Sequence, residues 1–198
     1  MTRRPAAFLD RDGVINVDRG YVCHAADFTF VSGAFEGAAA LQQLGFALVV
    51  ITNQSGIGRG LYSESAFDAL NHWMIGEFEQ RSIRIDGVFY CPHHPTDARG
   101  QYRRVCDCRK PAPGLLLRAA RELDLDLTRS AMFGDRASDL QAASAANVPL
   151  RYLLGTDGLA RPAPAEPRGL SIAEFRSLHE ATTSVELRDA VTQFAGVP

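Results

Sequence analysis

The chain is organised around one short stretch, Ala6-Ala7-Phe8-Leu9-Asp10-Arg11-Asp12-Gly13. Its apolar half predicts a short buried strand, which ends at two aspartates separated by one residue. Because positions i and i+2 of an extended backbone face the same side, Asp10 and Asp12 should both point to the carboxyl end of the strand, where open α/β sheets bind ligands. Two carboxylates this close repel unless a cation or a shared proton compensates, and Mg²⁺ prefers such oxygens. On its own, the motif is also typical of an acidic surface turn.

The composition indicates a globular domain of ordinary size. The chain has 198 residues, of which 46% are hydrophobic and 22% charged, enough for a sizeable core. A formal net charge of −2 argues against a nucleic acid as partner, and no apolar run reaches the length of a membrane span. The first residues lack the pattern of a signal peptide. We therefore expect a cytoplasmic monomer with reduced thiols.

Alternating apolar runs and helical periodicities predict a doubly wound α/β sheet. The predicted strands lie at 6–9, 46–51, 87–90, 131–133 and 150–154, and the predicted helices at 34–44, 64–78, 113–123 and 136–146. Ser63 is the expected N-cap of the second helix. The tail predicts a weak helix near 172–178 and a better one that carries Leu187, Val191 and Phe194 on one face.

Polar side chains also follow the second predicted strand. Thr52, Asn53, Gln54 and Ser55 supply hydrogen-bonding groups. The glycines of Gly56-Ile57-Gly58-Arg59-Gly60 would let the backbone approach an anion closely. Such a glycine-rich loop is often only a turn, but its place after a buried strand favours an anion site.

Three of the four cysteines lie in one region, in Cys91-Pro92-His93-His94 and Cys106-Asp107-Cys108. Cys91, His93, Cys106 and Cys108 form a closed set of three sulfurs and one imidazole, which favours a structural Zn²⁺ over reduced or redox-active thiols. We prefer His93 to His94 because its spacing from Cys91 matches the spacing of the second cysteine pair.

Two further stretches add charge to the same sheet edge. Lys110 is the one lysine in the chain, and its compact ammonium suits a single phosphoryl oxygen better than a guanidinium would. With Arg109 it directly follows the predicted zinc loop, although a solvated basic turn is the alternative. Asp135 ends the fourth strand as Asp10 ends the first, and Asp139 lies one helical turn further on.

Taken together, Asp10-x-Asp12-Gly13, Thr52-Asn53, Lys110 and Gly134-Asp135-x-x-x-Asp139 resemble the haloacid dehalogenase-like phosphatase superfamily. Cys-Pro-His-His and Cys-Asp-Cys-Arg-Lys resemble its D-glycero-D-manno-heptose 1,7-bisphosphate 7-phosphatase branch, and histidinol-phosphate phosphatases share them. The matching stretches run from about residue 6 to 154. The resemblance implies one capless, Rossmann-like domain over 1–198, with a zinc loop at 91–108, an irregular loop at 156–169 and a tail at 170–198.

The resemblance also implies Mg²⁺-dependent hydrolysis of a small sugar phosphate. Asp10 would be the nucleophile and Asp12 the general acid/base. Thr52 and Lys110 would stabilise the phosphoryl group, while Asp10, Asp12 and Asp135 would hold Mg²⁺. Substrate contacts are implied for Asp18, Arg19, Gly20, Tyr21, Asn53, Gln54, Ser55, Arg109 and Arg136, the last standing where lysine is frequent. The alternatives are a histidinol-phosphate phosphatase and a non-catalytic module that only binds metal and phosphate.

Overall fold

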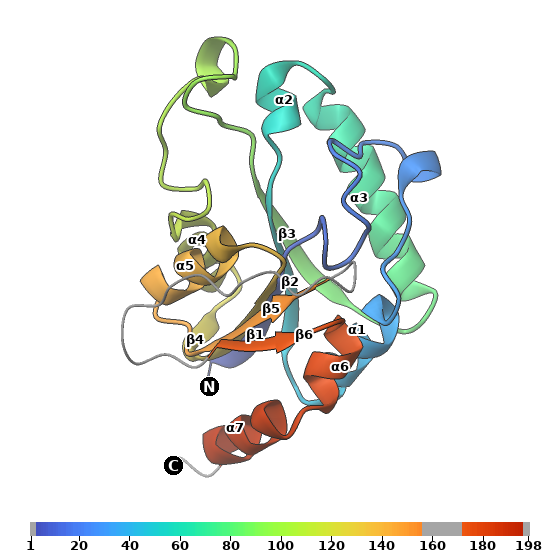
Figure 1. Cartoon of the computed structure of the whole chain (residues 1–198), viewed down its shortest axis with the longest axis vertical. Helices are drawn as coiled ribbons and strands as arrows, with labels where there is room; N and C mark the ends of the chain where they lie inside the picture. The colour runs from blue at the N-terminus through green and yellow to red at the C-terminus, as the bar shows by residue number, and fades with distance from the viewer. Residues whose placement is uncertain (1–2, 156–171, 196–198) are drawn as a thin grey trace.

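Six parallel strands form the sheet of the computed structural model, which describes residues 3–155 and 172–195 (Figure 1). The strands are β1 Arg4–Leu9, β2 Ala47–Asn53, β3 Ile85–Cys91, β4 Leu125–Gly134, β5 Leu150–Leu154 and β6 Ile172–Phe175. Their spatial order is β3-β2-β1-β4-β5-β6, with parallel neighbours throughout. The order reverses between β1 and β4, which opens a crevice at the carboxyl ends of these strands. The predicted doubly wound parallel sheet is confirmed.

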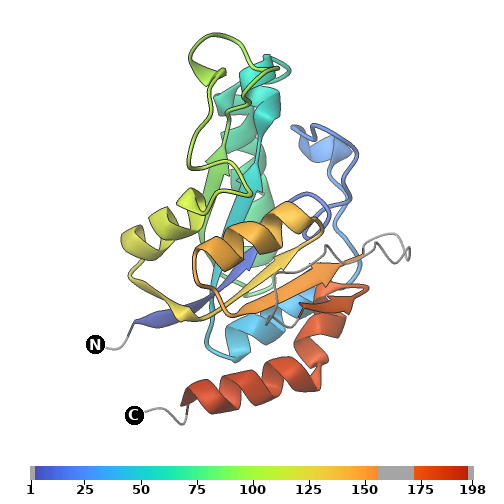
Figure 2. The ribbon, with the colours of Figure 1, turned by 60° about the vertical axis from the view of Figure 1, so that its left-hand side comes forward.

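Helices cover both faces of this sheet. They are α1 Ala34–Gln43, α2 Ser55–Arg59, α3 Glu64–Glu79, α4 Gly114–Glu122, α5 Ala137–Ala145, α6 Leu178–Thr183 and α7 Val185–Ala195, with 3-10 turns η1 Ala25–Asp27 and η2 Gly100–Tyr102. Helices α1, α3, α6 and α7 pack into the core on one face, and α4 and α5 into the core on the other (Figure 2). None of the described helices is long and apolar enough to cross a membrane.

β1 shows why a continuous apolar run is needed at the centre of the sheet. Ala7 and Leu9 belong to the first core, whereas Ala6 and Phe8 belong to the second. A parallel strand covered by helices on both sides has no solvent face, so it cannot alternate with polar residues. The predicted cap of α3 is confirmed as well, since the Ser63 hydroxyl accepts from the Ala66 amide at 3.1 Å.

The C-terminal tail is part of the fold. The predicted weak helix near 172–178 is wrong, because Ile172–Phe175 forms β6 and pairs with β5. Pairing with the exposed edge of β5 satisfies backbone groups that a short isolated helix would leave in water, and a tertiary partner of this kind overrides local propensity. Helix α7 occupies the region of the second predicted helix, with Leu187 buried. The loop predicted at 156–169 and the side chain of Phe194 lie outside the described residues.

The contact between α1 and α6 predicts the effect of a single methyl group. A Cβ added at Gly37 of α1 would lie 2.6 Å from the Leu178 Cγ atom and 2.7 Å from its carbonyl carbon. We expect Gly37→Ala to lower the free energy of unfolding by about 1–3 kcal/mol, because the backbone of α6 must shift. Urea unfolding of the purified variant measures this.

Gly76→Ala is the matched control, since Gly76 lies in α3 with open space around it. Alanine is the better helix former there, so this variant should gain up to about 1 kcal/mol. A Gly37→Ala variant as stable as the Gly76→Ala variant would contradict the proposed packing of the tail.

Candidate active site

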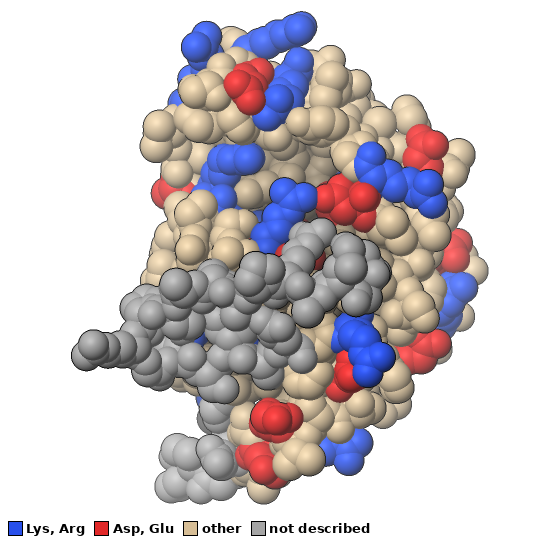
Figure 3. Space-filling view, in the orientation of Figure 1, with Lys and Arg blue, Asp and Glu red and all other residues tan. Residues whose placement is uncertain are grey.

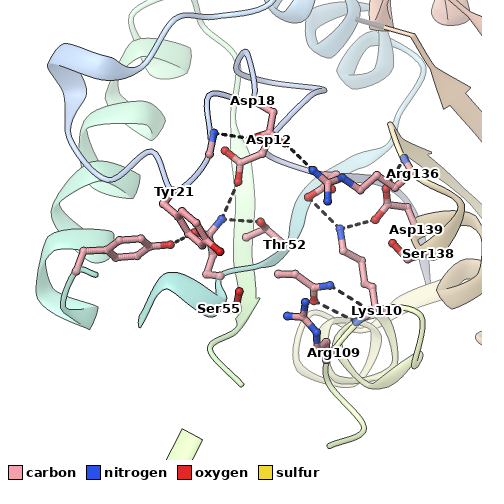
Figure 4. A pocket seen from close by; sticks show the side chains of 15 residues that line it. Asp12, Asp18, Tyr21, Thr52, Ser55, Arg109, Lys110, Arg136, Ser138 and Asp139 are labelled. Carbon is pink, nitrogen blue, oxygen red and sulfur yellow. Dashed lines mark hydrogen bonds and ion pairs between the residues drawn. The ribbon is translucent and has the colours of Figure 1, made fainter. Parts of the chain in front are cut away.

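A pocket of about 490 Å³ opens at the carboxyl ends of β1 and β2 (Figure 4). It is lined by Asp10, Asp12, Asp18, Gly20, Tyr21, Thr52, Asn53, Gln54, Ser55, Tyr62, Arg109, Lys110, Arg136, Ser138 and Asp139. The four residues predicted as catalytic all line it, and so do the predicted substrate contacts other than Arg19. Arg19 is exposed and lies outside the lining.

Three carboxylates meet one ammonium at the bottom of this pocket. The ligand atoms of Asp10, Asp135 and Asp139 lie within 4.8 Å of one another, and all three residues are buried. The Lys110 ammonium lies 2.9 Å from Asp10 Oδ1 and 2.6 Å from Asp139 Oδ1. It also donates to the carbonyl oxygen of Ile51 at 2.8 Å. The end of β1, the end of β2 and helix α5 are thus joined through a single side chain.

The electrostatics of this cluster suit a divalent cation. Burial raises the pKa of Asp10 from 3.8 to about 8; Lys110 opposes the shift, and Asp139 and Asp135 add to it. Burial alone would lower the pKa of Lys110, but Asp10 and Asp139 outweigh it and hold that pKa above its usual value. Three carboxylates against one ammonium leave an excess of negative charge, and hard oxygen donors are the ligands that Mg²⁺ prefers.

Asp12 lines the same pocket but lies outside this cluster. Its carboxylate accepts from Arg11 Nη2 at 2.9 and 3.0 Å, from Asn16 Nδ2 at 3.0 Å and from Gln54 Nε2 at 2.9 Å. The expectation that Asp10 and Asp12 share one direction is therefore only partly right. β1 ends at Leu9 and the chain turns at Gly13, where φ is +91°, so the alternation of a strand does not continue to Asp12.

Asn53 fastens the main chain at Lys110. Its Nδ2 donates to the Lys110 carbonyl oxygen, and its Oδ1 accepts from the Lys110 amide, both at 3.1 Å. Both ends of the carboxamide are therefore engaged by one backbone unit. Asn53 lines the pocket as predicted, yet its observed partners belong to the protein.

The glycine-rich stretch after β2 does not form the predicted open loop. Residues 55–59 are the one-turn helix α2, which Gly60 ends at φ +76°. A Cβ at Gly56 would overlap the ring of Tyr62, and a Cβ at Gly58 would overlap the carbonyl oxygen of Pro92. These glycines allow close packing against Tyr62 and the loop after β3. None of them lines the pocket, and an anion-binding role of this backbone stays a prediction.

The predicted zinc ligands come together beside the pocket. The ligand atoms of Cys91, His93, Cys106 and Cys108 lie within 4.8 Å of one another, with sulfur–sulfur distances of 3.1–3.6 Å. A tetrahedron with zinc–sulfur bonds of about 2.3 Å has edges of about 3.8 Å, close to this spacing. Burial lowers the pKa of His93, which keeps its imidazole neutral and able to bind a metal.

His94 lies outside the cluster, because its Nδ1 atom accepts from the backbone amides of Thr96 at 3.3 Å and Asp97 at 3.1 Å. The structure thus places His93, and not His94, beside the three thiols, as the sequence predicted. The cluster also contacts the rim of the pocket, since Arg109 Nη1 donates to the carbonyl oxygen of His93 at 3.2 Å.

Charged side chains surround the mouth of the pocket. Arg136 is paired with Asp18 at 2.6 Å across the opening, whereas Arg109 faces no carboxylate within the described part of the chain. Basic side chains also gather over the upper end of the face in Figure 3, where the loop between β3 and α4 lies beside α2. This distribution attracts an anionic ligand.

Sequence reasoning missed Arg11 and Tyr62. Arg11 is fully buried, holds Asp12 and donates to the carbonyl oxygen of Val22 at 2.9 Å. Its place between two aspartates was a usable signal, because a buried arginine needs an anionic partner. Tyr62 gave no such signal: it reaches the pocket only because α2 turns the chain back.

Comparisons with known proteins agree with this geometry. A family model described as HAD-hydrolase-like matches residues 107–173. A D-glycero-β-D-manno-heptose-1,7-bisphosphate 7-phosphatase of Vibrio cholerae is 52% identical over 153 residues, covering 77% of this chain and 82% of the relative. One of Photorhabdus laumondii is 43% identical over 182 residues, covering 92% and 97%. The longer match extends past residue 154, at a lower identity than the shorter one.

Solved structures share the fold over most of the chain. A putative HAD-like phosphatase of Mesorhizobium loti is 33% identical with a TM-score of 0.81, covering 96% of this chain and 87% of that one. The D,D-heptose 1,7-bisphosphate phosphatase of B. bronchiseptica, complexed with magnesium and phosphate, is 31% identical with a TM-score of 0.73. That match covers 90% of this chain and 96% of the other.

The crowded carboxylates predict a pH-dependent gain in stability from one substitution. Because the pKa of Asp10 rises to about 8 in the folded chain, its ionised form opposes folding increasingly as the pH rises from about 4 to 8. In magnesium-free buffer we expect Asp10→Asn to raise the urea midpoint at pH 8, with the gain shrinking as the pH falls towards 5. Unfolding curves across this range measure it.

Asp126→Asn is the control with the opposite sign. The hydrogen bond from Thr128 and the Arg129 ion pair lower the pKa of Asp126, so its ionised form supports folding and its loss should destabilise at pH 8. If Asp10→Asn also destabilised the magnesium-free protein at pH 8, the cluster would not carry the charge excess described here.

Proposed function

This chain belongs to the haloacid dehalogenase-like hydrolases, in the family of the D-glycero-β-D-manno-heptose-1,7-bisphosphate 7-phosphatases, and we propose that it removes the 7-phosphate of that sugar bisphosphate. One observation carries the proposal: Asp10 and Lys110 meet at 2.9 Å at the bottom of a pocket large enough for a sugar phosphate. A nucleophile beside a fixed positive charge is what phosphoryl transfer requires.

Asp10 is the proposed nucleophile. Its Oδ1 atom accepts from the Arg11 amide at 2.7 Å and pairs with Lys110, while Oδ2 has no partner within the described residues. Attack by Asp10 forms an oxygen–phosphorus bond as the bond from phosphorus to the sugar oxygen breaks. Asp12 donates a proton to the departing oxygen and then takes one from the water that cleaves the aspartyl-phosphate.

The Lys110 ammonium stays close to the negative charge throughout these steps. In the structure its ammonium contacts Asp10, Asp139 and the carbonyl oxygen of Ile51. When Asp10 is phosphorylated, its negative charge moves onto the phosphoryl oxygens, and the ammonium can stay close to that charge with only a small shift. Thr52, which also lines the pocket, offers a hydroxyl to the same group.

Two metal ions complete the proposal. Asp10 and Asp135, with Asp12, would hold Mg²⁺, which when bound neutralises the approach of an anionic nucleophile to an anionic phosphate. Zn²⁺ at Cys91, His93, Cys106 and Cys108 would be structural, since this closed set leaves no position for water. A cytoplasmic location and a monomeric state stay predictions from the sequence.

A histidinol-phosphate phosphatase is the second candidate, since the same chemistry acts there on another leaving group. The basic rim favours the bisphosphate, because Arg109 and Arg136 line the pocket. Arg19 and Arg59 do not add to this argument: neither lines the pocket, and Arg59 is paired with Asp97 at 2.8 Å. A module that only binds metal and phosphate would release no phosphate at all.

Phosphate-release assays on the two candidate substrates test the function directly. We expect kcat/KM to be at least about a hundredfold higher for the heptose bisphosphate than for histidinol phosphate, because only the bisphosphate engages both the cluster and the basic rim. Asp10→Asn should lower turnover by about a thousandfold or more while retaining the fold. Higher activity on histidinol phosphate would favour the second candidate, and substantial turnover by the Asp10→Asn variant would refute the nucleophile.

We expect removal of the proposed zinc to lower both the stability of the fold and the affinity for substrate. Metal analysis should find one zinc per chain, and chelation should lower the free energy of unfolding by about 2–4 kcal/mol. KM should rise, because Arg109 is bonded to the loop at His93. His93→Ala should lose zinc, whereas His94→Ala should keep it. Equal zinc content in these two variants would contradict the assignment.

A further inference from the structure

The side chain of Gln54 is fully engaged within the protein. Its Nε2 group donates to Asp12 Oδ2 at 2.9 Å and to Thr52 Oγ1 at 2.8 Å. Its Oε1 atom accepts from the Tyr62 hydroxyl at 2.5 Å. The residue is only 2% exposed. Both hydrogens of the amide are therefore used, and no donor remains for a substrate.

The chemistry of the three partners fixes the orientation of this amide. The Asp12 carboxylate also accepts hydrogen bonds from Arg11 and Asn16, so it acts as an acceptor here and the NH₂ end of Gln54 faces it. The carbonyl end then faces Tyr62, whose hydroxyl must donate. Burial holds the pKa of Tyr62 above its usual value, so the phenol keeps the proton that this bond needs.

We propose that Gln54, locked by Tyr62, is a positioning residue that presents the acid/base Asp12 and the Thr52 hydroxyl to the reacting phosphate, and is not a substrate contact. The inference rests on the proposed function, since it assigns Asp12 and Thr52 the tasks described above. Tyr62 does not contact Asp12 or Thr52 through these bonds and acts on them only by holding Gln54 in place.

The hydrogen bond from Gln54 also orients the Thr52 hydroxyl. Gln54 Nε2 occupies an acceptor position of its hydroxyl oxygen, and the hydroxyl hydrogen has no acceptor within the described residues. The side chain is 1% exposed and lines the pocket. The hydrogen is thus free to point at a phosphoryl oxygen, and Gln54 prevents the hydroxyl from accepting there instead. A donor oriented before substrate arrives costs no reorganisation during the reaction.

Gly56 makes the hydrogen bond between Tyr62 and Gln54 possible. The Tyr62 ring lies so close to its Cα atom that an added Cβ would overlap the ring. A larger residue at position 56 would push the ring away and take the hydroxyl out of reach of Gln54. Glycine is therefore required at position 56 because the Tyr62 ring must pack against it to reach Gln54.

The test separates proton donation from substrate binding by comparing two leaving groups. A sugar alkoxide needs a proton to depart, whereas p-nitrophenolate departs without one, so a misplaced Asp12 harms only the first reaction severely. Single-turnover phosphorylation of Tyr62→Phe and Gln54→Leu is measured with the heptose bisphosphate and with p-nitrophenyl phosphate, and steady-state kcat and KM are measured for the sugar.

For Tyr62→Phe we expect kcat on the sugar to fall by about tenfold with KM within about twofold, and the loss on the sugar to exceed the loss on the aryl phosphate by at least about fivefold. Gly56→Ala should show the same pattern, and Gly56→Ala/Tyr62→Phe no further loss, since both act on one contact. Tyr152→Phe is the matched control: it removes a buried hydroxyl on β5, away from the pocket, and should change neither reaction.

Urea midpoints of all variants accompany the kinetics, so that Tyr62→Phe can decide the question if Gln54→Leu does not fold. A raised KM with unchanged kcat in Gln54→Leu would make Gln54 a substrate contact and overturn the proposal. If Tyr62→Phe lowered the rates with both substrates equally, the contact between Tyr62 and Gln54 would be merely structural, and the proposal would be overturned as well. A wild-type chain inactive on both substrates would instead refute the proposed function, and the inference would fall with it.

Discussion

The burial of Lys110 among carboxylates is the constraint on which the rest of the structure depends. Its ammonium reaches Asp10 after β1, Asp139 on α5 and the main chain of β2 at Ile51. A lysine this deeply buried is stable only when paired and hydrogen-bonded, so these segments must meet at one point. The parallel sheet supplies that point, because the carboxyl ends of β1, β2 and β4 lie side by side.

The segment that carries Lys110 is itself held from two directions. Asn53 binds both the backbone amide and the backbone carbonyl of Lys110. On the other side, the thiol and imidazole cluster closes the loop between β3 and α4 directly before Arg109, and Gly58 lets α2 pack against that loop. A loop of arginines and small polar residues has no core of its own, so the position of the ammonium depends on the cluster.

The sequence predicted what depends on chain direction and local spacing. Apolar runs that end in aspartate located the sheet edge at Asp10 and Asp135, and cysteine spacing located the thiol cluster. The sequence-based predictions failed where residues distant in the sequence determine the local structure. β6 forms because β5 offers an unpaired edge, and Gly56 is a glycine because a tyrosine ring lies over it. Neither reason is written in the local pattern.

The charge count at the pocket explains why the rim differs from the bottom. When all three carboxyl groups are ionised, they and the one ammonium leave two negative charges, which one divalent cation would cancel. A phosphate dianion entering this balanced site brings new charge that the bottom cannot neutralise. That charge must be met at the mouth, where Arg109 faces no carboxylate of the described residues and Arg136 lies 2.6 Å from Asp18 and 3.8 Å from Asp135. An exposed pair such as Arg136–Asp18 contributes little stability, so the guanidinium can exchange its carboxylate for a phosphate at small cost.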